Sequence, residues 1–253
     1  MVEKINMTAK RGKITTSLLA IAVVLFIHTK AFAASTLRVG LPEPGQVPFM
    51  WVGEDNRVKG IYADTIRLIA KDIGVDVEFI AQSQARLIRH FLAAEVDIEM
   101  GVANSEKELA ELVNLSVYSV PFGFKNEVII YKKELRFPAF ILKDLKDQKV
   151  AVVRGTQAPD YVRREDYSSP LQIAKRVSRG WSEVGLMAEA TAMHYKYNDA
   201  MDYEISLPYQ SKAIRIRLHK QHVALIEKIN KSIIELQDRG ELESIICDYL
   251  CGK

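Results

Sequence analysis

The sequence predicts an α/β fold in which short apolar strands alternate with amphipathic helices. One apolar stripe at helical spacing consists of Tyr62, Ile66, Ile69 and Ile73. Directly after it, residues 75–80 alternate between apolar and polar side chains, which is typical of a strand. Strands separated by helices of this length indicate βαβ units, so we expect a parallel sheet.

The remaining elements continue this alternation along the chain. Expected strands cover residues 37–41, 96–102, 127–131, 149–153, 184–188 and 213–218. Expected helices cover residues 87–92, 189–197, 226–236 and 242–250. Gly240 ends the third of these helices, since glycine is a common C-terminal signal. No repeat or low-complexity linker interrupts the pattern, so two α/β lobes joined by extended segments are the simplest organisation.

Residues 1–33 have the pattern of a secretory signal peptide. A basic start precedes an apolar run over residues 14–27, and the small-residue site Ala31-Phe32-Ala33 follows. The run is shorter than the roughly 20 residues that a membrane-spanning helix needs. We therefore expect cleavage near Ala33 and Ala34 and a periplasmic mature protein. An uncleaved signal anchor is the alternative.

The positive net charge of the chain belongs to this N-terminal segment. The chain has 35 basic and 32 acidic residues, of which residues 1–33 hold five and one, which leaves 30 against 31, or −1. A basic surface of the kind that nucleic-acid binding requires is not expected on the mature chain. We therefore expect no nucleic-acid partner.

The sequence lacks the common motifs of cofactor and catalytic sites. It has no dinucleotide-binding glycine fingerprint, no phosphate loop and no nucleophile elbow. His219 and His222 lie among lysines at an expected turn, so a solvated surface is a simpler interpretation than a shared metal. We expect neither a cofactor nor a metal. The polar side chains that follow the strands instead indicate a ligand site, as in open α/β sheets.

Both cysteines, Cys247 and Cys251, lie near the C-terminus. In an oxidising compartment such an even pair suggests a disulfide. At this helical spacing we expect that a bridge requires the last turn to unwind. The sequence alone is compatible both with a disulfide between the two cysteines and with two free thiols.

Several short motifs are weak individually but specific in their order. In the first half they are Val47-Pro48-Phe49, Gly60-Ile61-Tyr62-Ala63-Asp64, Glu95-Val96-Asp97, and Leu115-Ser116 followed by Pro121-Phe122. In the second half they are Asp144-Leu145, residues 149–153, Gly155-Thr156, and Ile229-Asn230 through Gly240. Over about residues 37–250, this series resembles family 3 of the periplasmic solute-binding proteins, which includes the glutamine- and lysine/arginine/ornithine-binding proteins.

The resemblance implies a periplasmic-binding-protein-like type II fold with two lobes, each with a five-stranded sheet, and a ligand cleft between them. Lobe one is expected to comprise residues 34–122 and 210–253, and lobe two residues 123–209. The hinges then lie near residues 121–127 and 208–212. Ligand binding would shift the hinge equilibrium towards a closed form, which in relatives is recognised by an inner-membrane ABC permease. A monomer with one small-molecule ligand is expected.

Relatives that bind α-amino acids hold the ammonium group with acids from both lobes. The first acid falls on Glu43, in a loop after a strand, where the alternative is a solvated loop residue. The second falls near Glu189, at a helix start, where the alternative is a favourable contact with the helix dipole. Gly155-Thr156 lies between a strand and an expected helix, where backbone N–H groups and a hydroxyl can bind an oxyanion of the ligand. The alternative is a turn glycine followed by an N-cap threonine without a role in binding. Arg154 beside it either adds charge to the site or points to solvent.

The chain departs from the family at the arginine that clamps the ligand carboxylate. That arginine falls on Leu109, which cannot form a bidentate pair with a carboxylate. Asn104 takes the place of the usual Thr or Ser, and Gln84 that of a stacking aromatic. Gln84 and Arg86 therefore form a candidate replacement corner.

Four aromatic residues lie near the expected cleft mouth. Trp51 follows a Pro-Phe turn and is a candidate cap of the cleft. Phe49, Tyr118 and Phe122 fit either a stacking wall or core packing.

We therefore expect a non-catalytic periplasmic substrate-binding protein that captures a small polar solute, amino-acid-like or amine-containing, for an ABC permease. Two alternatives stay open. One is a sensory or accessory binding protein without transport. The other is an enzyme similar to cyclohexadienyl dehydratases, which would need the arginine that Leu109 replaces.

Overall fold

The structure, a computed structural model, describes residues 36–103, 109–135, 139–154, 156 and 158–251. The expected signal peptide, Asn104 and Gly155 lie outside the described residues. Within the described ranges, no helix has both the length and the apolar character needed to cross a bilayer.

The first half of the chain contains the predicted βαβ unit. Its strands are β1 (Thr36–Pro42), β2 (Trp51–Val52), β3 (Val58–Lys59), β4 (Asp76–Gln82), β5 (Ile98–Ala103), β6 (Ser116–Tyr118) and β7 (Gly123–Tyr131). Its helices are α2 (Ile61–Ile73), α3 (Gln84–Leu92) and α4 (Ala110–Asn114). β1 runs parallel to β4 on one side and to β5 on the other. Gly74 ends α2 with a φ of 73°, a left-handed conformation that glycine adopts without strain.

The second half contains two strands, β9 and β11, that the sequence did not predict. Its strands are β8 (Lys149–Val153), β9 (Arg163–Tyr167), β10 (Val184–Ala188), β11 (Glu204–Ile205) and β12 (Gln210–His219). Its helices are α5 (Pro170–Ser178), α6 (Glu189–Tyr197), α7 (Ile226–Asp238) and α8 (Glu241–Leu250), with 3₁₀ turns η1 (Leu142–Leu145) and η2 (Lys220–Leu225). The expectation of a helix directly after β8 is wrong, because β9 follows and pairs with β8 in parallel. β9 is a charged strand at the end of the sheet, so it lacks the apolar pattern that marks a buried strand.

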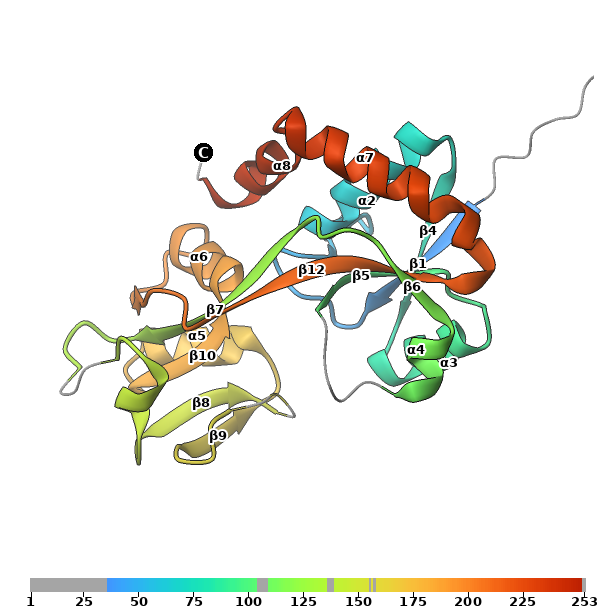
Figure 1. Cartoon of the computed structure of the whole chain (residues 1–253). Helices are drawn as coiled ribbons and strands as arrows, with labels where there is room; N and C mark the ends of the chain where they lie inside the picture. Colours follow the sequence, from blue (N-terminus) through green and yellow to red (C-terminus); the bar gives the residue numbers. More distant parts are fainter. Residues whose placement is uncertain (1–35, 104–108, 136–138, 155, 157, 252–253) are drawn as a thin grey trace, which may run out of the picture. The chain divides into compact units, whose positions relative to one another are not determined.

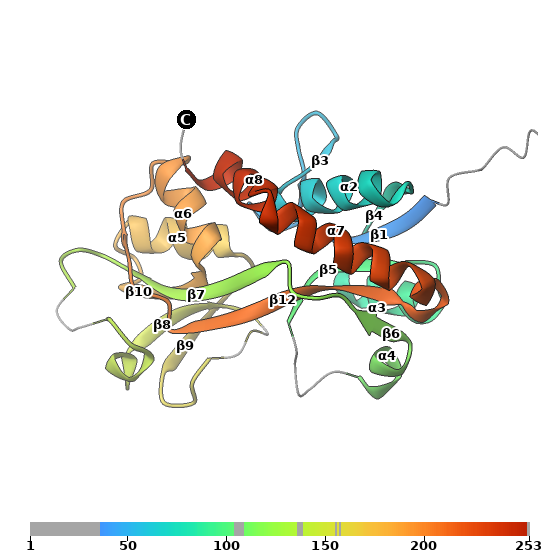
Figure 2. The same cartoon turned by 45° about the horizontal axis from the view of Figure 1, so that its top comes forward.

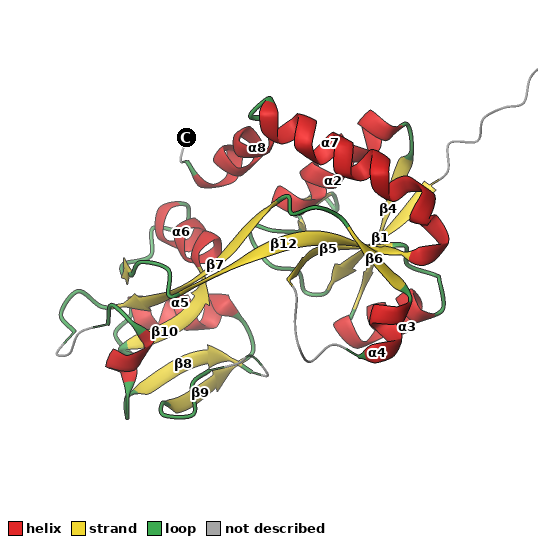
Figure 3. Ribbon diagram, viewed as in Figure 1, coloured by secondary structure: helices red, strands yellow, loops and turns green. Residues whose placement is uncertain are grey.

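One mixed sheet runs through the described residues in the order β4-β1-β5-β12-β7-β10-β8-β9. β12 pairs antiparallel with β5 and with β7, and β7 pairs antiparallel with β10. The prediction of a parallel sheet is therefore wrong for the middle of the sheet and correct for the strands that flank it. The reason is that β7 and β12 run in opposite directions between the two halves of the sheet (Figure 1, Figure 3).

The two expected hinge segments, near residues 121–127 and 208–212, overlap a pair of antiparallel strands. Residues 123–127 of β7 pair with residues 210–214 of β12, from Gln210 opposite Glu127 to Ile214 opposite Gly123. We call residues 123–127 and 210–214 the crossing ribbon. Its strands are held to each other by backbone hydrogen bonds, so they are coupled segments rather than two independent ones.

Buried apolar side chains hold the helices against the sheet. Leu37, Ile66 and Ile233 belong to a cluster that joins β1 to α2 and α7. Val128 and Ile173 belong to a cluster that joins β7 to α5. In Figure 2, α2, α7 and α8 lie together over one part of the sheet, and α5 and α6 over another. These layers are those expected of an α/β protein.

Cys247 and Cys251 form a disulfide at the end of α8. The expectation that a bridge requires the last turn to unwind is wrong. The Cys251 N–H still donates to the carbonyl oxygen of Cys247 at 2.9 Å, as in a helical turn. The nearby Tyr249 hydroxyl also donates to Asp64 at 2.5 Å and accepts from the Gly60 N–H at 3.0 Å, which ties α8 to the start of α2.

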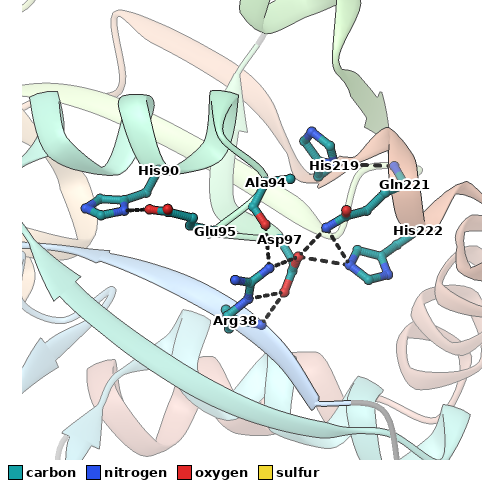
Figure 4. A network of polar contacts seen from close by, with 8 residues as sticks. All are labelled: Arg38, His90, Ala94, Glu95, Asp97, His219, Gln221 and His222. Carbon is teal, nitrogen blue, oxygen red and sulfur yellow. Dashed lines mark hydrogen bonds and ion pairs between the residues drawn. The ribbon is translucent and has the colours of Figure 1, made fainter.

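A buried carboxylate joins β1, β5 and η2 (Figure 4). Asp97 is 1% exposed and accepts hydrogen bonds from the backbone and side chain of Arg38, from Gln221, and from His222 at 2.9 Å. His219 is also buried and packs edge-on against Phe91. The expectation that both histidines lie on a solvated surface is therefore wrong, because η2 folds back over the end of β5.

Candidate ligand-binding cleft

Three cavities that share lining residues adjoin one another. The first, of about 410 Å³, lies between Glu43, in the loop after β1, and Ser169, at the start of α5. The second, of about 360 Å³, shares Lys125 and Thr156 with the first. The third, of about 290 Å³, shares Glu99 with it. We call these three cavities together the cleft.

Tight backbone turns fix the loop that carries Glu43. The Glu43 N–H donates to the carbonyl oxygen of Gln82 at 2.9 Å, and the Gly45 N–H donates to that of Pro42 at 2.6 Å. Gly45 has a φ of +85°, and a Cβ atom there would lie 2.8 Å from the Cα of Trp51. The position therefore requires glycine. The loop places Glu43 beyond the carboxyl end of β1, where ligands of open α/β sheets bind.

The structure brings three of the predicted binding residues to the cleft. Glu43 is exposed and lines the first cavity. Gln84, the first residue of α3, lines the first and third cavities and donates to Glu99 Oε1 at 3.3 Å. Thr156 lines the first and second cavities. Its hydroxyl donates to the Val153 carbonyl oxygen at 2.6 Å, so it closes a turn and does not cap a helix.

Three other predicted residues do not line the cleft. Trp51 packs against Tyr249, with ring centroids 5.8 Å apart, and lies near His194 at 6.4 Å. Arg86 donates to Gln82 from the exposed face of α3. Arg154 is exposed, and its backbone N–H pairs with Tyr167.

Glu189 lines a different cavity, of about 190 Å³. It is the first residue of α6, and its carboxylate accepts from the Asn126 amide at 2.7 Å. Apolar side chains such as Phe122 and Ile246 form most of the remaining wall. The predicted pair of acids, Glu43 and Glu189, thus lines two cavities, which share Phe49, Tyr62 and Lys125 as wall residues.

The helix start at the cleft belongs to α5. Ser169 is its N-cap and accepts from the Gln172 N–H at 3.4 Å, and Pro170 occupies the first turn. Ser168, Ser169 and Pro170 all line the first cavity. The Ser-Ser-Pro sequence is a helix-start signal that the sequence analysis missed. It supplies at α5 the backbone N–H groups that were expected near Gly155.

The clamp position is apolar in the structure as in the sequence. Leu109 is exposed and borders the third cavity. Arg217 lies in the same wall, 3% exposed, with its Nη1 2.5 Å from Glu99 Oε2 and its Nε 3.4 Å from the Tyr118 hydroxyl. Glu99 and Arg217 are directly opposite each other on β5 and β12, so the two charges compensate each other across the strands.

Charged residues in two predicted strands and in one expected hinge segment are the part of the cleft that sequence reasoning missed. Glu99, Lys125 and Glu127 all line it. Lys125 Nζ lies 3.5 Å from Glu127 Oε1 and 5.9 Å from the centre of the Phe49 ring. For Glu99 and Glu127, a charge that interrupts an apolar strand was the available signal, since such residues rarely face a core.

The aromatic residues near the cleft pack mainly against one another. The Tyr62 ring lies 5.0 Å from that of Phe49 and 5.7 Å from that of Phe122. Burial, with a smaller contribution from the charge of Glu127, raises the pKa of Tyr62 well above its usual range. Of these three, Phe49 and Tyr62 also border the first cavity.

The described residues contain no group of three His, Cys, Asp or Glu side chains that could hold a metal ion. The polar groups that line the cleft are carboxylate, ammonium, amide and hydroxyl groups on strands, in loops and at one helix start. Such an arrangement suits a small polar ligand.

Fold and cleft together define the class of protein. A mixed sheet with helices on its faces, crossed by a strand pair, is the architecture of the type II periplasmic binding proteins. Within that class, residues 37–251 match the family model of "Bacterial extracellular solute-binding proteins, family 3", and the chain belongs to this family.

The chain is similar to several characterised members at low identity. It is 22% identical over 227 residues to an arginine-binding periplasmic protein of Mannheimia haemolytica, which covers 83% of this chain and 90% of that protein. It is 21% identical over 246 residues to the L-cystine-binding protein TcyJ of Escherichia coli (strain K12), with 90% and 91% covered. A solved ancestral cationic amino acid solute-binding protein matches with a TM-score of 0.72 and 20% identity over 85% of this chain and 96% of that chain.

Proposed function

We propose that the chain captures a small polar solute, amino-acid-like or amine-containing, in the cleft and delivers it unchanged to a membrane ABC permease. One observation carries this proposal. Polar side chains from distant parts of the chain, including Glu43, Glu99, Thr156 and Ser169, line the same first cavity of the cleft. The family and the relatives named as arginine- and cystine-binding proteins support it.

In this proposal, Glu43 provides the charge that receives an amine, and Glu99, already paired with Arg217, accepts a further hydrogen bond from it. They line the same first cavity, and Glu99 is oriented by Arg217 on one oxygen and Gln84 on the other. A carboxylate held in this way keeps its position when a ligand arrives. A positioned charge gains more from pairing than a free one, because less side-chain entropy is lost.

Capture in this proposal involves closure of two lobes, residues 34–122 with 210–253 and residues 123–209, about the crossing ribbon. A ligand that contacts both sides of the cleft stabilises the closed form and thereby signals occupancy to the permease. We further propose that residues 1–33 are removed near Ala33 during export. The extracellular family to which the chain belongs supports this location.

A thermal-shift screen of the chain without residues 1–33 tests the function. The panel comprises amino acids, polyamines, organic acids and small peptides. A ligand at 100 times its Kd is expected to add about 2.7 kcal/mol to the free energy of unfolding. NMR of the solute recovered after incubation distinguishes capture from catalysis. A panel without any stabilising compound, or a chemically altered solute, would contradict the proposal.

The Glu43 carboxylate is tested by substitution. Glu43→Gln should weaken binding of an amine-containing ligand by about 1–3 kcal/mol, because it removes the charge but keeps the shape. Isothermal titration calorimetry measures the change. Glu54→Gln, in an exposed loop that does not border the cleft, is the matched control. Equal affinities for the two variants would exclude Glu43 as an amine contact.

A further inference from the structure

Lysine side chains face each other on the crossing ribbon. The register of β7 and β12 places Lys212 directly opposite Lys125. Directly opposed residues of antiparallel strands project from the same face with Cβ atoms about 4.5–5.5 Å apart, and like charges there destabilise the pair. Both lysines line the second cavity of the cleft.

The surroundings of this lysine pair compensate only part of its charge. Glu127, with its side chain 25% exposed, is the one acid among the residues along the second cavity, and its Oε1 lies 3.5 Å from Lys125 Nζ. Opposite Glu127 stands Gln210, which is neutral. Two cations and one carboxylate therefore leave a net charge of +1 along this cavity.

At the other end of β12, in contrast to the lysine pair, the opposed charges compensate each other. There Arg217 stands opposite Glu99, and a 2.5 Å ion pair compensates both charges. Arg217 is 3% exposed, whereas the Lys125 side chain is 31% exposed and Lys212 is exposed. Leu109 contributes no charge to the third cavity. Among the described cations along the cleft, the two lysines of the ribbon are thus the ones placed to receive an anion.

We propose that Lys125 and Lys212 hold the carboxylate of the bound solute. The crossing ribbon is then the cationic site that anchors the anion in the cleft. The inference rests on the proposed solute-binding function and narrows it to solutes that carry a carboxylate as well as an amine. Such a solute extends from the ribbon towards Glu43, across the first cavity, which Lys125 borders. Its carboxylate relieves the repulsion between the two lysines, so binding is coupled to the strand pair that joins both halves of the sheet.

The test compares amino acids with amines that lack the carboxylate. Arginine and agmatine, and lysine and cadaverine, are titrated calorimetrically into wild-type protein and into Lys125→Gln, Lys212→Gln and the double variant. Each substitution should weaken arginine or lysine binding about tenfold, which corresponds to one desolvated charge contact. Agmatine and cadaverine should bind the variants as tightly as wild type or more tightly, because a repelling charge has been removed.

Control variants separate charge from structure. Lys228→Gln, on the exposed face of α7, removes one charge far from the cleft and should change nothing. Lys125→Arg and Lys212→Arg should restore amino-acid binding. In ligand-free protein, Lys212→Gln should raise the midpoint of urea unfolding, since it ends the repulsion and leaves the Lys125–Glu127 ion pair in place.

Two results would overturn the anchor alone. One is unchanged arginine and lysine affinity in the double variant, and the other is binding of the amines by wild-type protein as tight as that of the amino acids. Failure of wild-type protein to bind any of the four probes or any compound of the wider panel would instead overturn the proposed function together with the anchor.

Discussion

Asp97 connects three segments of the chain through one buried side chain. Burial on its own would raise the pKa of this carboxyl, but hydrogen bonds from the Arg38 side chain and backbone and from His222 outweigh it and lower the pKa to about 2. The carboxylate therefore stabilises the folded state in its charged form. In the same network His90 contacts Glu95, and Arg38 also donates to the Ala94 carbonyl oxygen (Figure 4).

The pH dependence of unfolding should report this residue. A carboxyl with a lowered folded-state pKa stabilises fully above its unfolded value of 3.8, and the stabilisation is lost as the pH falls towards 2. The loss should amount to about 2 kcal/mol between pH 4 and pH 2. Urea unfolding across this range measures it, and Asp97→Asn should flatten the curve. Asp76→Asn, at an exposed position, is the control; equal slopes in both variants would contradict the assignment.

Single positions were predictable where a backbone turn accompanies the side chain. Glu43 follows a strand and precedes Pro44 and Gly45, so its place at the cleft could be predicted from local sequence. Lys125 could not, because its role depends on Lys212, its partner across two strands that are far apart in the chain. Cross-strand register is a tertiary property that no local pattern contains.

At the scale of elements, the disulfide at the end of α8 should have a local effect. Its ring is short, so replacing Cys247 and Cys251 with serine should lower the free energy of unfolding by no more than about 2 kcal/mol. Hydrogen exchange in residues 247–251 should increase, while α7 stays protected. Mass spectrometry of peptides from both helices measures the difference.

Tyr249→Phe is the matched comparison for the disulfide. It keeps the bridge but removes the hydroxyl contacts with Asp64 and the Gly60 N–H, so α8 should loosen where it meets α2. If the serine variant instead exposed α7 and α8 together, the bridge would hold the whole helix pair and the local interpretation would fail.

Element prediction succeeded where one face of the element is apolar. α2 and α7 follow the expected ranges, because burial on one side leaves a periodic pattern in the sequence. β9 escaped prediction since its exposed, charged residues lack that pattern. The antiparallel direction of β12 escaped it because a pattern of apolar residues is the same for both strand directions.

At the scale of the whole molecule, capture predicts a change of shape. Small-angle scattering of the chain without residues 1–33 should give a smaller radius of gyration at saturating ligand than without ligand, because the two proposed lobes close on it. The Lys125→Gln, Lys212→Gln double variant should show this compaction only at higher ligand concentrations. If the protein is saturated with ligand and its radius of gyration does not decrease, capture by closure of the lobes is contradicted.

The register of the crossing ribbon also limits which changes of chain length the protein tolerates. Successive residues of a strand face opposite sides, so one added or deleted residue reverses the facing of every side chain beyond it. A one-codon insertion between Gly123 and Lys125 would turn Lys125 and Glu127 away from Lys212 and the cleft. A two-codon insertion would keep the facing but shift the pairing. The surface loops accept new residues far more readily, so length variation is expected to accumulate there and to spare residues 123–127 and 210–214.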